Sequence, residues 1–141
     1  MKYPKTLEEY ITQPPGLTNT NNDKKIDSSK NESKLYHFLE AWELEPETDM
    51  SVPLGAGGII STPSDLVKFS DALFAGKLLK NESLELMKTI KDKYGLGLIQ
   101  IPFYDKIGYG HTGGIDGFST VFSYFPDGNI SYALTSNGTN F

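Results

Sequence analysis

The sequence feature that most restricts the fold is a glycine-rich stretch at residues 107–129, IGYGHTGGIDGFSTVFSYFPDGN. Residues 107–112 can be extended, and Gly113 and Gly114 then free the backbone to bend and let another group approach it closely. Residues 118–125 are rich in the aromatic and β-branched side chains that strands favour. The stretch therefore predicts two strands joined at a glycine-rich corner.

A tight turn and a further strand follow. Proline and glycine make residues 126–129, PDGN, strong turn chemistry, because proline fixes φ and glycine accepts a positive φ. Residues 130–136 then alternate, with Ile130, Tyr132 and Leu134 on one face. Residues 94–101 predict another strand and residues 102–106 a turn. These segments together predict an antiparallel meander of four strands.

A helix signal precedes the meander. Thr62 is a good N-cap, Pro63 suits the first helical position, and Asp65 places negative charge where the helix dipole favours it. Gly76 marks the end of this helix. Its apolar stripe consists of Leu66, Phe69 and Leu73, widened by Val67 and Phe74. Asn81 is then expected to cap a second helix that ends in lysines.

The N-terminal third gives weaker signals. Residues 6–9, TLEE, fit a capping box that starts a short helix at Thr6, and residues 14–16, PPG, stop it. Residues 18–34 are polar and predict a surface loop that contributes no core and little order. Residues 35–44 fit one face of a strand or of a helix, and extended structure is favoured. Residues 45–53 predict an acidic loop.

This order of elements predicts an α+β fold in which an antiparallel β-sheet is flanked by helices. We divide the chain into residues 1–53, a helix with irregular loops, residues 54–92, two helices, and residues 93–137, the four-stranded meander. A chain of 141 residues is long enough for one domain with one core.

Composition excludes several function classes. The formal net charge is −5 and no basic patch stands out, so nucleic acid is not an expected partner. The chain contains no cysteine, which removes disulfides, thiolate catalysis and cysteine metal sites. No apolar run is long enough to span a bilayer, and the N-terminal residues carry no secretory signal. The chain by itself therefore does not fix a compartment.

The common cofactor patterns are weak. The two histidines, His37 and His111, lie far apart in the sequence, and His37 with Glu40 makes a poor ligand pair. Residues 55–58, GAGG, lack the spacing of a nucleotide-binding loop, and close packing before a helix explains them better. No serine has a nucleophile-elbow context. We therefore expect neither a metal nor another cofactor.

The remaining candidate site is the run His111-Thr112-Gly113-Gly114. One interpretation is structural, with a histidine that packs at a strand end before a glycine turn. The other is functional. An imidazole and a hydroxyl at a strand edge, followed by backbone N–H groups freed by glycine, could hold a carboxylate or carbonyl oxygen.

Three passages in order resemble the serine β-lactamase and penicillin-binding-protein superfamily, in its branch of class C β-lactamases, D-alanyl-D-alanine carboxypeptidases and esterases. Residues 109–118, YGHTGGIDGF, are similar to the family's third motif, Lys-Thr-Gly or His-Thr-Gly. Residues 57–66, GGIISTPSDL, resemble the glycine pair and helix start that precede it. Residues 6–10 with 15–20 resemble the segment after the second motif. Together these passages cover most of the chain.

The resemblance implies an acyl-transfer mechanism in which a serine of a Ser-x-x-Lys motif attacks a carbonyl. It implies that His111 and Thr112 contact the substrate carboxylate and support proton transfer. It further implies that the backbone N–H of Gly114 supplies half of an oxyanion hole and that Gly113 keeps the strand edge clear. The implied substrates are D-alanyl peptides, β-lactams or small esters.

The sequence departs from the family pattern in two motifs. No serine is followed three residues later by lysine, and no tyrosine is followed two residues later by asparagine. We therefore interpret the chain as a C-terminal, partial β-lactamase/transpeptidase-like domain that lacks its nucleophile, or as a non-catalytic binding or assembly module. Either way we expect self-association or a complementary N-terminal segment. The family suggests a periplasmic, extracellular or membrane-associated setting.

Overall fold

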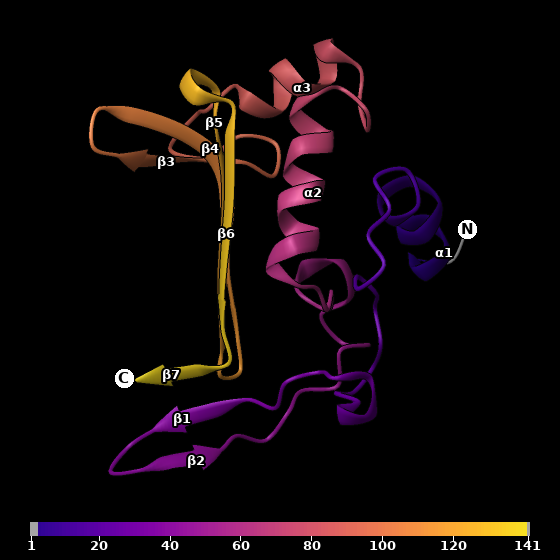
Figure 1. Ribbon diagram of the computed structural model, residues 1–141, viewed down its shortest axis with the longest axis vertical. Helices are drawn as coiled ribbons and strands as arrows, with labels where there is room; N and C mark the ends of the chain where they lie inside the picture. Colours follow the sequence, from indigo (N-terminus) through magenta and orange to yellow (C-terminus); the bar gives the residue numbers. More distant parts are fainter. Residues whose placement is uncertain (1–2, 141) are drawn as a thin grey trace.

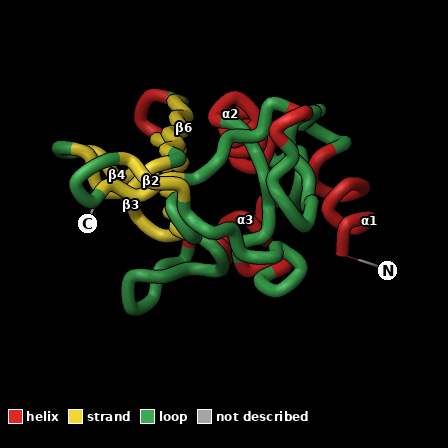
Figure 2. Tube along the Cα trace, turned by 90° about the horizontal axis from the view of Figure 1, so that it is seen from below, coloured by secondary structure: helices red, strands yellow, loops and turns green. Residues whose placement is uncertain are grey.

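The computed structural model describes residues 3–140, in which strands and helices are segregated on two sides of the molecule (Figure 2). The chain therefore has the expected α+β architecture. The helices are α1 (Tyr3–Leu7), α2 (Pro63–Phe74) and α3 (Asn81–Lys88). The strands are β1 (Tyr36–Phe38), β2 (Trp42–Leu44), β3 (Ile99–Phe103), β4 (Lys106–Ile115), β5 (Phe118–Phe125), β6 (Ile130–Ser136) and β7 (Gly138–Asn140).

The larger sheet is the predicted meander. Its strand order is β3-β4-β5-β6, with every neighbouring pair antiparallel. In Figure 1 this sheet is seen almost edge-on, with α2 running along one side of it. Because side chains alternate across a strand, each strand contributes one set of residues to the α2 side and one to the opposite side. We call these the covered face and the open face.

Aromatic packing joins α2 to the covered face. Phe69 meets Phe122 edge-to-face with ring centroids 5.8 Å apart, and Phe74 stacks on Tyr124 at 4.3 Å. Between these pairs the hydroxyl of Ser131 donates to the buried Ser70 hydroxyl over 3.0 Å. Phe69 and Phe74 of the predicted apolar stripe therefore meet the sheet, together with the polar Ser70.

The start of α2 follows the sequence prediction in detail. The Thr62 hydroxyl accepts a hydrogen bond from the backbone N–H of Asp65 over 3.2 Å, and Pro63 is the first helical residue. Gly76, with φ of +71°, lies just beyond the helix end, a conformation that glycine adopts without steric cost.

Asp65 also anchors the N-terminal segment to α2. Its carboxylate is fully buried and accepts the backbone N–H of Asn19 at 2.7 Å and the hydroxyl of Thr20 at 3.1 Å. Lys68 lies 3.2 Å away. Burial raises the pKa of Asp65, but the hydrogen bonds from Asn19, Lys68 and Thr20 outweigh it and hold the pKa below its usual value. The residue 18–34 loop thus has defined contacts, contrary to the expectation of little order.

A smaller sheet joins the two halves of the chain. Residues 35–44 are extended, as favoured, and form the hairpin β1–β2. Strand β1 also pairs in parallel with β7, so Tyr36 lies opposite Gly138. The Trp42 ring fills the space beside Gly138, where an added Cβ would approach it to 2.6 Å.

Several predicted boundaries are wrong. The N-terminal helix is already formed at Tyr3, before Thr6, and continues as a π-helical segment to Thr12. Asn81 lies inside α3, whose cap position is Lys80. Capping chemistry at both sites favoured a later start, by three residues for the first helix and by one for α3, and helix ends are the least certain part of such a prediction.

The turns of the meander also differ from the prediction. Strand β4 runs through Gly113 and Gly114, and the corner lies at Asp116 and Gly117, where Asp116 has φ of +51°. Ladder pairing with β5 keeps the two glycines extended. Strand β3 begins only at Ile99 and continues to Phe103, so it is shifted relative to the expected segment, residues 94–101.

Candidate functional site

The four candidate residues lie together in the last half of β4. Gly110 is the last residue of β4 that pairs with β3, through Ile99. From His111 to Ile115, β4 pairs with β5 on one side only, within the part of the chain that the structure describes. This end of β4 is therefore a strand edge whose backbone groups can meet a ligand.

Strand alternation separates the two polar side chains of the predicted site. His111 lies opposite Phe122, on the covered face, whereas Thr112 lies opposite Val121, on the open face. A ligand that contacts both must therefore approach the edge of β4 rather than either face.

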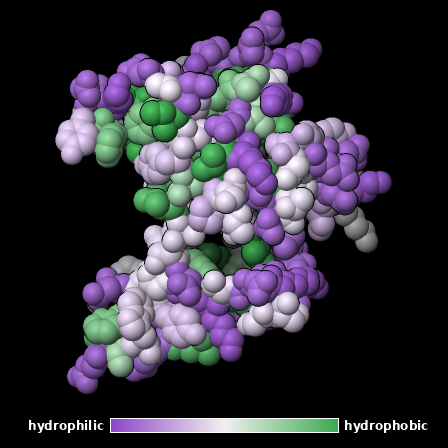
Figure 3. All heavy atoms as spheres, viewed as in Figure 1, coloured by the Kyte–Doolittle hydropathy of each residue, from purple (hydrophilic) through white to green (hydrophobic). Residues whose placement is uncertain are grey.

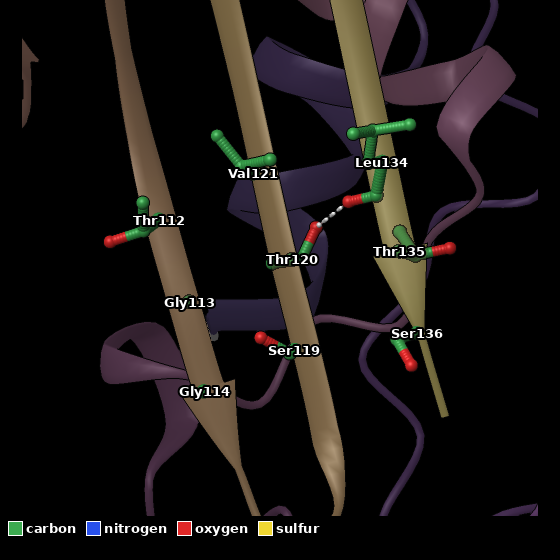
Figure 4. A pocket seen from close by; sticks show the side chains of 9 residues that line it. All are labelled: Thr112, Gly113, Gly114, Ser119, Thr120, Val121, Leu134, Thr135 and Ser136. Atoms are coloured by element: carbon green, nitrogen blue, oxygen red, sulfur yellow. Dashed lines mark hydrogen bonds between the residues drawn. The ribbon is translucent and has the colours of Figure 1, made fainter. Parts of the chain in front are cut away.

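Thr112 borders a shallow groove on the sheet, together with residues of β5 and β6 (Figure 4). One hydroxyl there is already used, since Thr120 donates to the carbonyl oxygen of Leu134 over 3.1 Å. The hydroxyls of Thr112 and Ser119 have no hydrogen-bond partner within residues 3–140, so they are available to a ligand. The full lining consists of Thr112, Gly113, Gly114, Ser119, Thr120, Val121, Leu134, Thr135 and Ser136.

Gly113 and Gly114 differ in whether packing inside the sheet requires a glycine. A Cβ on Gly113 would lie 2.8 Å from the methyl of Thr120, so packing inside the sheet already requires a small residue there. A Cβ on Gly114 would meet nothing closer than 3.9 Å, the carbonyl oxygen of Phe118. Internal packing therefore does not demand glycine at position 114, and its bare backbone leaves room for an outside group.

The His111 imidazole is held on both sides. Its Nδ1 is hydrogen-bonded to the carbonyl oxygen of Thr112, and its Nε2 is bonded to the hydroxyl of Tyr94. The two rings meet edge-to-face with centroids 5.5 Å apart. Sequence reasoning missed Tyr94, because the 17-residue separation carries no periodic signal and only the fold of residues 94–98 brings the two rings together.

A second missed contact braces the corner after β4. Asp116 accepts hydrogen bonds from the backbone N–H and the hydroxyl of Thr48, each at 2.8 Å. The acidic loop of residues 45–53 is thereby fixed beside the end of the candidate site. An acidic side chain two residues after a glycine pair was the available signal, but its partner lies 68 residues away.

His37 lies elsewhere, in the hairpin rather than in a helix, so His37 and Glu40 do not share a helical face. Its neighbours are Glu45, at 3.3 Å from Nδ1, and Glu43, at 3.8 Å from Nε2. Among residues 3–140, no three His, Cys, Asp or Glu side chains gather closely enough to hold a metal ion. None of the described helices is long and apolar enough to cross a membrane.

The sequence model of the family described as Beta-lactamase matches residues 1–141, the whole chain. The chain belongs to the beta-lactamase family. A protein of Bacillus subtilis (strain 168) named as a penicillin-binding protein, PbpX, is 28% identical over 141 residues. That match covers 98% of this chain and 35% of the relative, so the chain spans about a third of its length.

Several solved structures have the same fold as this chain. A D-stereospecific amidohydrolase from Streptomyces sp. superposes with a TM-score of 0.84 at 29% identity, covering 98% of this chain and 44% of that one. D-amino acid amidase from Ochrobactrum anthropi SV3 superposes with a TM-score of 0.84 at 23% identity, covering 98% of this chain and 45% of that one. A penicillin-binding protein from Bacillus halodurans superposes with a TM-score of 0.76 at 19% identity, covering 96% of this chain and 45% of that one. The β-lactamase/transpeptidase-like fold expected from the resemblance is confirmed.

Proposed function

We propose that this chain supplies the third-motif wall of an acyl-serine hydrolase site, and that a Ser-x-x-Lys segment outside this sequence supplies the nucleophile. The reaction is acyl transfer or hydrolysis of D-alanyl peptides, β-lactams, small esters or D-configured amino acid amides. The amidohydrolase and amidase named above support the last class, because their names describe D-specific amide hydrolysis.

The observation that carries the proposal is the free edge of β4 beyond Gly110. There the Thr112 hydroxyl has no partner within the described residues, and the backbone at Gly114 is not covered by a side chain. In this proposal Thr112 and His111 lie beside the carboxylate of the substrate. The Thr112 hydroxyl donates a hydrogen bond to that carboxylate directly. The backbone N–H of Gly114 stabilises the oxyanion, and Gly113, which has no side chain, keeps the edge of β4 clear for the substrate.

The proposed steps balance without a cofactor. The serine Oγ bonds to the carbonyl carbon, the C–N or C–O bond of the substrate breaks, and the serine proton passes to the leaving group. Water then adds to the acyl-serine, which releases a carboxylic acid and restores the hydroxyl. This chain contributes donors and shape to both steps, and the proton acceptor comes with the missing motifs.

The test is intact-protein mass after incubation with a penicillin and, separately, with a fluorophosphonate. This chain alone should form no adduct, whereas the chain joined to its upstream Ser-x-x-Lys segment should gain one acyl group. Thr112→Val in the joined protein should slow acylation by about 10- to 100-fold, the value of one hydrogen bond to a charged group. Ser119→Ala, on the same groove, is the matched control.

An adduct on a single serine of this chain alone would contradict the proposal, because the nucleophile would then lie within residues 1–141. Absence of an adduct in the joined protein, with the fold intact, would favour the alternative of a non-catalytic binding or assembly module.

That alternative has its own support on the open face. Leu134, Ile130 and Phe103 point to this side of the meander and are largely exposed. We propose that another segment covers them, either a second copy or the complementary N-terminal part of the domain. Light scattering of the isolated chain should show self-association that disappears when the upstream segment is joined, and a stable monomer in both cases would contradict it.

A further inference from the structure

Tyr94 lies in the irregular segment just before β3, and its backbone bridges to Lys91 and Ile99. Its side chain is 48% exposed and reaches across to His111, to which the hydroxyl is hydrogen-bonded. Tyr94 is exposed and His111 is only half-buried, so burial of apolar area by itself does not account for the pairing.

The two bonds to His111 define the state of the imidazole. A carbonyl oxygen can only accept, so Nδ1 must carry the proton that is donated to Thr112. In the neutral ring Nε2 is then unprotonated and accepts the Tyr94 O–H. The neutral imidazole consequently has no free N–H to offer to a ligand.

We propose that Tyr94 is a positioning residue for His111, which it holds as the Nδ1–H tautomer with Nε2 occupied. This inference rests on the proposed function, since His111 belongs to the third-motif strand. It changes the role given to the histidine. Neutral His111 does not bind a substrate carboxylate directly but fixes the backbone of β4 through the Thr112 carbonyl, beside the Thr112 hydroxyl and the Gly114 N–H.

This role has a geometric reason. The Thr112 carbonyl belongs to the unpaired half of β4, where no strand beyond Gly110 holds the outer edge within the described residues. A ring fixed between Tyr94 and that carbonyl replaces part of the missing strand contact. The edge is then already ordered before a ligand arrives, which lowers the cost of binding.

The test reads the tautomer directly by nitrogen-15 NMR of the imidazole rings. The chain has only two histidines, so His37→Gln leaves His111 as the single signal. In the neutral imidazole, we expect a protonated Nδ1 and an unprotonated Nε2. Tyr94→Phe should shift the tautomer ratio toward Nε2–H by about 2- to 10-fold, the value of one neutral hydrogen bond.

Tyr104→Phe is the matched control, because Tyr104 is 92% exposed and its ring contacts Phe103 rather than a histidine. A wild-type Nε2–H tautomer, or equal ratios in the two variants, would overturn the proposal. If Tyr94→Phe does not fold, uniform 3-fluorotyrosine labelling keeps the side chain and strengthens its O–H as a donor. The Nε2 signal must then move, and an unchanged signal would equally overturn it.

Activity separates this inference from the proposed function. In the joined, acylating protein, Tyr94→Phe should lower kcat/KM for acylation by about tenfold while Tyr104→Phe leaves it unchanged. A tautomer shift without any acylation would overturn the proposed function alone. Acylation with an unchanged tautomer ratio would overturn only the role of Tyr94.

Discussion

The two faces of the meander are built by the same strands and yet differ in what covers them. On the covered face, Phe122 and Tyr124 pack against α2, and Ser131 bonds to Ser70. On the open face, Phe125 packs between Phe103 and Tyr132 and is buried, but Phe103 itself is largely exposed and Leu134 at the other end is 64% exposed. Figure 3 shows hydrophobic residues gathered mainly over the meander side, while the N-terminal segment is mostly hydrophilic.

The difference shows that alternation creates two potential interfaces but assigns a partner to neither. The covered face obtains its partner from a helix only a few dozen residues upstream. The open face would need a partner from another segment or another molecule. The candidate site lies where both faces reach the free edge of β4, so it depends on one interface that is present and one that we propose.

The largest expected loss of folding stability comes from a substitution on the covered face. Phe122→Ala should lower the free energy of unfolding by roughly 2–3 kcal/mol, somewhat less than for a fully buried phenylalanine, because Phe122 is half-buried. Leu134→Ala on the open face should change it by less than about 0.5 kcal/mol. Urea unfolding of the two variants measures both values, and equal losses would mean that the faces are covered alike.

A smaller loss is expected where α2 is anchored over that face. Asp65→Asn keeps the size of the side chain but removes its charge and weakens its bonds to Asn19 and Thr20. We expect a loss of about 1–3 kcal/mol at neutral pH. Asp71→Asn, at an exposed position of the same helix, is the control and should change little.

The sign of the pH dependence follows from the pKa of Asp65, which is lowered from 3.8 in the folded chain. The carboxylate therefore stabilises the fold above the unfolded pKa, and this contribution is lost as the pH falls through the lower, folded pKa. The difference between wild type and Asp65→Asn should shrink from about pH 7 to below about pH 3. A difference that is constant with pH would exclude the anchoring role.

The smallest effect on stability, but a clear one on association, is expected from the open face. Leu134→Thr should leave the free energy of unfolding within about 0.5 kcal/mol of wild type while reducing self-association, because it removes exposed apolar surface. Light scattering against concentration gives the readout. Thr135→Ser is the control, because the Thr135 side chain lies on the covered face. Unchanged association in Leu134→Thr would place the interface elsewhere.

The local elements were predictable where the signal was local. The cap at Thr62, the glycine after α2 and the alternation of residues 130–136 each depend on chemistry within a few residues, and each is confirmed. The predicted glycine corner was wrong, because ladder pairing with β5 keeps Gly113 and Gly114 extended. The helix starts near Thr6 and Asn81 were also wrong, since capping signals locate a helix end only to within a few residues.

The candidate site was predictable only in part. The sequence located His111, Thr112, Gly113 and Gly114 in one strand, but alternation places the histidine and the threonine on opposite faces. It could not reveal Tyr94, which holds His111, or Thr48, which braces Asp116. These contacts join residues far apart in the chain, and no pattern within either segment encodes its partner.

The sequence by itself determined the secondary-structure types, the meander and the family of this protein, because each follows from local chemistry or from motifs that stand intact in the chain. The tertiary structure decided which side of each strand is covered, how far β3 follows β4 and which groups hold His111. Those choices depend on where distant side chains meet, and that is set by packing of the whole chain rather than by any one segment.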